Sequence, residues 1–205
     1  MMKKLFIIFA ALLMVFSLIA CGDTEEADDD NKRKTEEVIE SEENDRRSAM
    51  DVAEKGMKAT LEFDFKKYDD LCLIKTEKML EKAAKEMDMD LDEFLEEVFD
   101  CSSFDEYMDE KAEEAKDKYE DKYGEFSYEI TKTDEDTFTS KELKNYKEKI
   151  EDTCDEFDID VDDITEVSNV TVKVKIDGEE DNDTQKETFT VIKYNGKWYL
   201  EPMGF

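Results

Sequence analysis

The chain has 205 residues; 60 of them are Asp or Glu, 29 are Lys or Arg and none is His, which gives a net charge of −31. This charge argues against nucleic acid as a partner, because phosphates require a basic patch on the protein. It also argues against adsorption onto an anionic membrane surface. The lack of histidine removes Ser–His and Cys–His nucleophile pairs, imidazole metal ligands and the most common general base.

The first twenty residues have the pattern of a secretory signal. Met1–Lys4 carry positive charge, and residues 5–19 form an uncharged apolar run that is too short to span a membrane comfortably. Leu18-Ile19-Ala20-Cys21 at its end resembles the lipobox of bacterial lipoproteins. The resemblance implies cleavage between Ala20 and Cys21, a diacylglyceryl group on the sulfur of Cys21, and anchoring by that lipid at the extracytoplasmic face of a bacterial cell membrane. An ordinary signal with a chance cysteine is the alternative.

The residues after the signal predict a tether. Residues 21–44 are rich in Asp and Glu, and only Val38 and Ile39 among them are bulky and apolar. Such a segment cannot bury enough surface to offset the entropy of ordering, so we expect it to be disordered. Only two basic residues precede Cys21, so the mature chain carries a net charge of −33. We therefore expect a signal peptide at 1–20, a lipidated cysteine and acidic tether at 21–44, and a single α+β domain at 45–205.

Three cysteines remain beyond the anchor. Cys72 and Cys101 each lie near the end of a helical segment, so a disulfide between them is one alternative outside the cell. Free thiols are favoured, because nothing in the sequence shows an oxidising compartment. Cys154 lies on an apolar helix face and is expected to be a buried thiol.

Apolar residues at three- and four-residue spacing, together with capping residues, predict the helices. Between the last two of them, Phe126, Tyr128 and Ile130 alternate with polar residues, which predicts a half-buried strand. The expected helices are residues 48–68, a short segment after Thr76, another from Asp90, residues 103–123 ending at Gly124, and residues 139–157.

The end of the chain predicts a three-stranded meander. Residues 170–176 alternate as a strand, a loop over 177–183 follows, and Asn195-Gly196 predicts a tight hairpin because both turn positions need positive φ. A two-residue turn pairs Tyr194 with Lys197 and Val191 with Leu200. Both faces of the hairpin carry apolar residues, so we expect it to be central in the sheet. One face would hold Phe189, Val191, Trp198 and Leu200 as hairpin core, and the other Ile192, Tyr194 and Tyr199.

This order of elements is α+β, with N-terminal helices followed by a curved antiparallel sheet. It resembles the cone-like roll of nuclear-transport-factor-like and cystatin-like proteins, and residues 187–200 resemble the terminal hairpin of small lipoproteins of unknown function with that fold. The helical stretch 76–123 is longer than a minimal protein of this fold needs. The resemblance implies a curved sheet around a helix and, in enzymes of this fold, an Asp with a His or Tyr inside the cone. Tyr128 and Tyr199 are the tyrosines expected to face the sheet, with packing as their alternative role.

Three acidic stretches are candidates for a calcium site. Residues 158–163 and 88–93 have alternate carboxylates, but each lacks the glycine at the sixth position and the bidentate Glu at the twelfth. Residues 177–183 follow no spacing rule. We therefore expect solvated acidic surface, no dedicated metal and no cofactor.

These observations favour a lipid-anchored, extracytoplasmic domain that binds something and catalyses nothing. The partner would be a small apolar molecule in the cone or another envelope protein. The alternative is a cone-fold enzyme, of isomerase or hydrolase type, that uses a carboxylate and a tyrosine.

Overall fold

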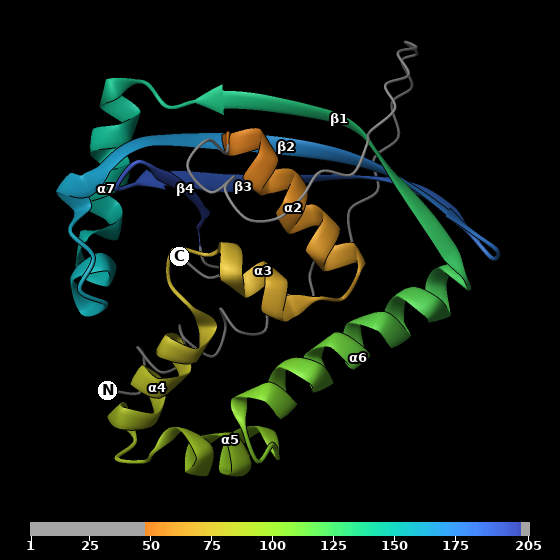
Figure 1. Ribbon diagram of the computed structural model, residues 1–205, viewed down its shortest axis with the longest axis horizontal. Coiled ribbons are helices and arrows are strands. Elements are labelled where there is room, and N and C mark those ends of the chain that lie inside the picture. The colour runs from red at the N-terminus through yellow and green to blue at the C-terminus, as the bar shows by residue number, and fades with distance from the viewer. Residues whose placement is uncertain (1–47, 202–205) are drawn as a thin grey trace.

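The computed structural model describes residues 48–201 as an α+β fold (Figure 1). Within these residues, five helices precede a four-stranded sheet, and one more helix separates its first two strands. The helices are α2 (Ala49–Leu61), α3 (Phe65–Leu71), α4 (Thr76–Glu86), α5 (Leu91–Phe99), α6 (Phe104–Tyr123) and α7 (Ser140–Glu156). The strands are β1 (Phe126–Thr137), β2 (Ile164–Gly178), β3 (Asn182–Tyr194) and β4 (Lys197–Leu200), with a short 3-10 turn at Val161–Asp163.

The helix expected over 48–68 is two helices. Ser48 begins α2 with a capping box, as predicted. Phe63 then adopts φ 57, a left-handed conformation that no helix tolerates in its interior. Asp64 restarts the chain as the N-cap of α3, because its carboxylate accepts the backbone N–H of Lys67 at 3.0 Å. The apolar spacing is almost continuous across this break, so periodicity alone could not reveal it.

The other helix ends follow the predicted caps. Asp90 and Ser103 cap α5 and α6, and Thr139 begins α7 with a complete capping box. Gly124 ends α6 with φ 68, the positive value that favours glycine there. The cap of α4 was not predicted: Asp69 of α3 accepts the backbone N–H of Thr76 at 2.7 Å across the intervening turn.

The sheet is antiparallel with the order β1-β2-β3-β4. The expected meander forms, but β2 and β3 extend further than predicted, so only residues 179–181 connect them. Asp177 pairs with Asn182 inside the region that was expected to be loop.

The β3–β4 hairpin has the predicted register but not the predicted place. Tyr194 pairs with Lys197 and Val191 pairs with Leu200 around the Asn195-Gly196 turn. The expectation of a central hairpin is wrong, because β4 is an edge strand. Residues 72–73 cover that edge: Cys72 bridges Leu200, and the N–H of Leu73 donates to the Leu200 carbonyl at 2.9 Å. This cover explains why both faces of the hairpin carry apolar side chains.

Three apolar clusters organise the described residues. Figure 1 shows α2 lying across the curled sheet, α7 at one end of it, and α4, α5 and the start of α6 grouped away from it. The first cluster joins α2, α3 and the end of α6 to one face of the sheet. The second lies among α4, α5 and α6. The third joins α7 to the opposite face through residues such as Ile150, Val167 and Ile192.

Candidate functional site

The sequence-predicted anchor, Ala20 and Cys21, lies outside the described residues. Within residues 48–201, no helix combines the length and apolar character needed to cross a membrane.

The three remaining cysteines are buried free thiols. Cys72 belongs to the cluster beneath α2 and Cys101 to the separate cluster of α4–α6, so the structure does not contain the disulfide alternative. Burial raises the pKa of Cys72 to about 12 and those of Cys101 and Cys154 to about 11. All three are therefore protonated at neutral pH and are poor nucleophiles.

The predicted hairpin core is present with one correction. Phe189, Val191 and Leu200 are buried in the cluster beneath α2. Trp198 packs against that cluster but is only partly buried. The ammonium of Lys193, its cross-strand partner, lies 5.3 Å from the centre of the indole ring. The ring therefore closes the edge of the core instead of filling its centre.

The acidic stretches serve local structure. Asp90 caps α5, and Asp160 accepts the N–H of the residue two positions later at the start of the 3-10 turn. Asp177 pairs with Lys175 at 2.8 Å. In the part of the chain that the structure describes, no group of three or more Cys, Asp or Glu side chains is placed to hold a metal ion.

The face of the sheet beneath α2 is filled by side chains. Val52 and Ala53 of α2 and Val172 of β2 have no exposed surface. Gly56 lets α2 approach closely, because a Cβ there would lie 2.8 Å from Cδ1 of Leu200. This face of the sheet is thus covered by α2, with their side chains in direct contact.

A polar network lies beside that apolar contact, between α6 and β3. Tyr123 donates its hydroxyl to Asp183 at 2.9 Å, and Lys122 donates to the same carboxylate oxygen at 3.0 Å. Gln185 donates to the Tyr123 hydroxyl at 2.9 Å and accepts from Tyr119 at 3.4 Å. Alternate residues of β3 therefore present polar groups to the tyrosines of α6.

Burial and pairing set the charge states of this network. Burial alone favours the neutral form of Asp183, but the hydrogen bonds from Lys122 and Tyr123 outweigh it and hold the pKa of Asp183 below its ordinary value. Burial also raises the pKa values of Tyr119 and Tyr123. Both phenols are therefore protonated donors at neutral pH, and the carboxylate is neutralised by its own lysine.

Glu187 continues the same row of β3 but has no such partner. It lies opposite Val172 and is half-buried. Burial raises its pKa, and a backbone interaction with Thr188 opposes the shift. Among the described residues no basic side chain pairs with it.

Tyr68 of α3 is the second unpartnered group at this place. The residue is 8% exposed, and its hydroxyl makes no hydrogen bond within residues 48–201. Burial raises its pKa well above the ordinary value, and the charge of Glu187 contributes to the shift. Glu187 also raises the pKa of Tyr119. The charge of Glu187 therefore favours the protonated form of both tyrosines.

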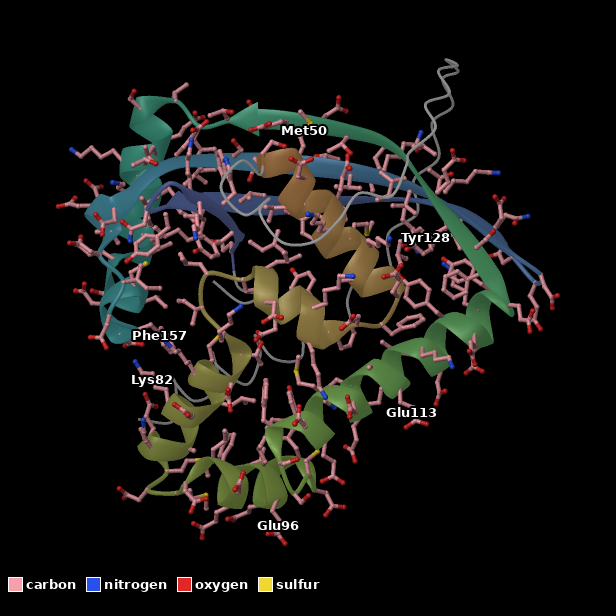
Figure 2. All side chains as sticks on the ribbon, in the orientation of Figure 1. Met50, Lys82, Glu96, Glu113, Tyr128 and Phe157 are labelled. Carbon is pink, nitrogen blue, oxygen red and sulfur yellow. The ribbon has the colours of Figure 1, made fainter. Side chains whose placement is uncertain are left out.

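From the sequence we expected Tyr128 and Tyr199 to be the tyrosines that face the sheet. Tyr128 is half-buried and donates to Glu62 at 3.0 Å, so its hydroxyl is already used (Figure 2). Tyr199 is paired with Ile192, on the face opposite the α2 cluster. The signal for Glu187 was available in its alternation with Phe189 and Val191, which places a carboxylate on the apolar face of β3. The signal for Tyr68 was not, because it depends on the break at Phe63.

The comparisons with known proteins add no relative. No family model, no curated protein and no solved structure matches this chain.

Glutamine at position 187 should stabilise the fold at neutral pH. The pKa of Glu187 is higher in the folded chain than in the unfolded one, so its ionised form costs stability, and that cost fades as the pH falls through the folded pKa. At pH 8, urea unfolding should therefore give a higher free energy of unfolding for Glu187→Gln than for wild type. This difference should decrease toward pH 5, which is still above the isoelectric point of about 4.2.

Glu129→Gln is the matched control, because Glu129 is exposed and alternates with Tyr128 onto the other face of β1. It should show no comparable gain. A Glu187→Gln protein that is less stable than wild type, or a gain that does not depend on pH, would contradict this account.

Proposed function

We propose that this protein is a lipid-anchored, extracytoplasmic interaction domain without catalytic activity. Its anchor is a diacylglyceryl group on Cys21, and it acts at the outer face of a bacterial cell membrane. The lipobox-like residues 18–21 after an apolar run support the anchor. The high negative charge argues against nucleic acid as the partner.

The observation that carries the interaction role is the packing of α2. Its side chains are buried against β2 and β3, where a ligand would otherwise sit in a cone. We also propose that α2 and the curled sheet correspond to the cone-like roll of nuclear-transport-factor-like and cystatin-like proteins. With that interior occupied, an envelope protein is a better candidate partner than a small apolar molecule enclosed by the sheet.

A second candidate function is an enzyme of isomerase or hydrolase type. The observation in its favour is the half-buried carboxylate of Glu187, whose pKa is raised by burial, since perturbed carboxyl groups are common in active sites. Turnover of a chromogenic ester by the wild-type chain, and its loss in Glu187→Gln, would favour this enzyme over the interaction domain.

Loss of Cys21 should release the protein from the membrane. A single acyl chain binds a membrane only marginally, whereas two provide stable anchoring, at roughly 0.8 kcal/mol for each buried methylene. Cells expressing Cys21→Ala should therefore incorporate no labelled fatty acid into the protein. Wild type should be labelled and should sediment with membranes.

Cys154→Ala provides the control, because it also removes one cysteine but from a buried position in the cluster beneath α7. It should retain the label. The anchor would be refuted if Cys21→Ala and wild type were labelled equally and fractionated equally with membranes. The location would be refuted if the wild-type protein resisted protease added to intact cells that lack an outer permeability barrier.

A further inference from the structure

The two edges of the sheet differ in how they are covered. Residues 72–73 lie along β4, whereas β1 has only β2 beside it among the described strands (Figure 1). β1 is 12 residues long. The outer side of an edge strand carries unpaired N–H and C=O groups, and these can accept another strand. Within residues 48–201, β1 is therefore the free edge of the sheet.

A hydrogen bond just after β1 shows which of its backbone groups face outward. The N–H of Phe138 donates to the Val167 carbonyl at 2.9 Å, so this pair and every second pair just before it bond to β2. The backbone groups of Thr133, Glu135 and Thr137 therefore face away from β2. No group within residues 48–201 bonds to them. This end of β1 thus presents three N–H and three C=O groups to an incoming strand.

A row of α2 side chains lies beside this end of β1. The Thr133 hydroxyl donates to the Glu54 carboxylate at 2.5 Å, and the Tyr128 hydroxyl donates to that of Glu62, so α2 runs along β1 in the opposite direction. Met50 precedes Glu54 by one turn and lies on the same side of the helix, which places it beside the residues after Thr133. Figure 2 shows Met50 at β1. Its 38% exposure is the highest for a large apolar side chain among the described residues.

The two faces of this end of β1 differ in chemistry. Glu135 lies on the α2 side because it alternates with Thr133, and Asp134 and Asp136 lie on the other side. Side chains of an added strand lie beside those of its neighbour on each face. A strand that fits this edge therefore has an apolar residue next to Met50 and basic residues opposite the two aspartates.

We propose that the free edge of β1, beside Met50, binds an extended segment of an envelope protein in which basic and apolar residues alternate. The inference rests on the proposed interaction function and gives the class of its partner. The segment adds a strand to the sheet. Main-chain hydrogen bonds to Thr133, Glu135 and Thr137 provide affinity, and the alternating side chains provide specificity.

The charges of β1 argue against the two other strands that could occupy this edge. A second copy paired about Glu135 would set Asp134 of one chain opposite Asp136 of the other, and like charges in that position are destabilising. The chain's own residues 21–44 are rich in Asp and Glu, so they meet the same repulsion. A basic segment of another protein is attracted instead, because the whole chain carries a net charge of −31.

The test is amide hydrogen exchange of the full-length chain in a non-ionic detergent, followed by NMR. In the free protein, the amides of Thr133, Glu135 and Thr137 should exchange faster than those of Asp134 and Asp136, which bond to β2. The probe is the peptide acetyl-Lys-Val-Lys-Val-Lys-Val-Lys-amide, which should slow exchange at the three outward amides saturably. Protection of those amides without peptide would mean that the chain itself or a second copy covers the edge, and would overturn the proposal.

Matched peptides and variants separate strand addition from general attraction to an acidic protein. The same peptide with N-methylated valines keeps its charge but loses the donors that face β1, so it should give no protection. Glu135→Pro removes one outward N–H, a change that edge strands tolerate, and it should bind the probe several-fold more weakly than Glu135→Ala, which keeps that N–H. Met50→Ser should also bind it more weakly than wild type, and Glu96→Ala in α5 should bind it equally.

Each variant is first shown to be folded by its melting curve, and the N-methylated peptide tests the wild-type chain alone. Equal protection by that peptide, or by acetyl-Glu-Val-Glu-Val-Glu-Val-Glu-amide, would overturn the proposal. Equal binding by Glu135→Pro and Glu135→Ala, or by Met50→Ser and wild type, would also overturn it. None of these results depends on Cys21, so a failure here is distinct from a failure of the anchoring experiment.

Discussion

Replacing Leu200 by alanine should lower the free energy of unfolding by about 2–5 kcal/mol, the range for large-to-small changes at buried leucines. Leu200 of β4 is 1% exposed and pairs with Val191 of β3. Its side chain fills the space above Gly56 of α2, and its carbonyl accepts the N–H of Leu73. The substitution would leave a cavity where α2, the edge strand and the covering segment meet.

Trp198→Ala is the informative comparison, because the tryptophan is larger but only partly buried. Urea unfolding should show a smaller loss for Trp198→Ala than for Leu200→Ala. The opposite order would mean that the indole ring, and not Leu200, holds the hairpin against α2.

Local chemistry explains what the sequence could predict. The register of the β3–β4 hairpin follows from Asn195-Gly196, whose positive φ values fit a two-residue turn, and the helix ends follow from side chains such as Asp90 and Thr139 that bond the adjacent N–H groups. These features depend on residues within a few positions of one another, so a single sequence contains them.

Contacts between residues far apart in the sequence explain the features that the sequence could not predict. The strand at the edge of the sheet cannot be deduced from apolar residues on both of its faces, because residues 72–73 cover it from another part of the chain. The break at Phe63 is likewise supported from outside, by contacts with the rings of Tyr119 and Phe126. Glu187 could be placed on the apolar face by alternation, but its lack of a basic partner depends on which helices lie above it.

The group formed by α4, α5 and the start of α6 should unfold separately from the sheet. Its cluster shares no residue with the cluster beneath α2. The partly buried ring of Phe65 in α3 packs against it. The other links are polar: Lys66 of α3 pairs with Asp105 of α6 at 3.0 Å, and Lys82 of α4 pairs with Glu156 at 2.6 Å. Figure 2 shows Lys82 beside Phe157. The Nζ atom of Lys82 lies 5.1 Å from the centre of the Phe157 ring. Exposed ion pairs contribute little to stability, so these links should couple the two parts only weakly.

Leu95→Ala tests this separation. Leu95 has no exposed surface and lies in the middle of the α4–α6 cluster, so the change should cost that group about 2–5 kcal/mol. Hydrogen exchange at neutral pH should become faster at the amides of α4 and α5, while β2 and β3 keep their protection, because local units can open without global unfolding. Glu96→Ala is the control from the same helix, since Glu96 points away from the group in Figure 2. If Leu95→Ala speeds exchange equally in α5 and β3, the helices and the sheet unfold as one cooperative unit and the separation is wrong.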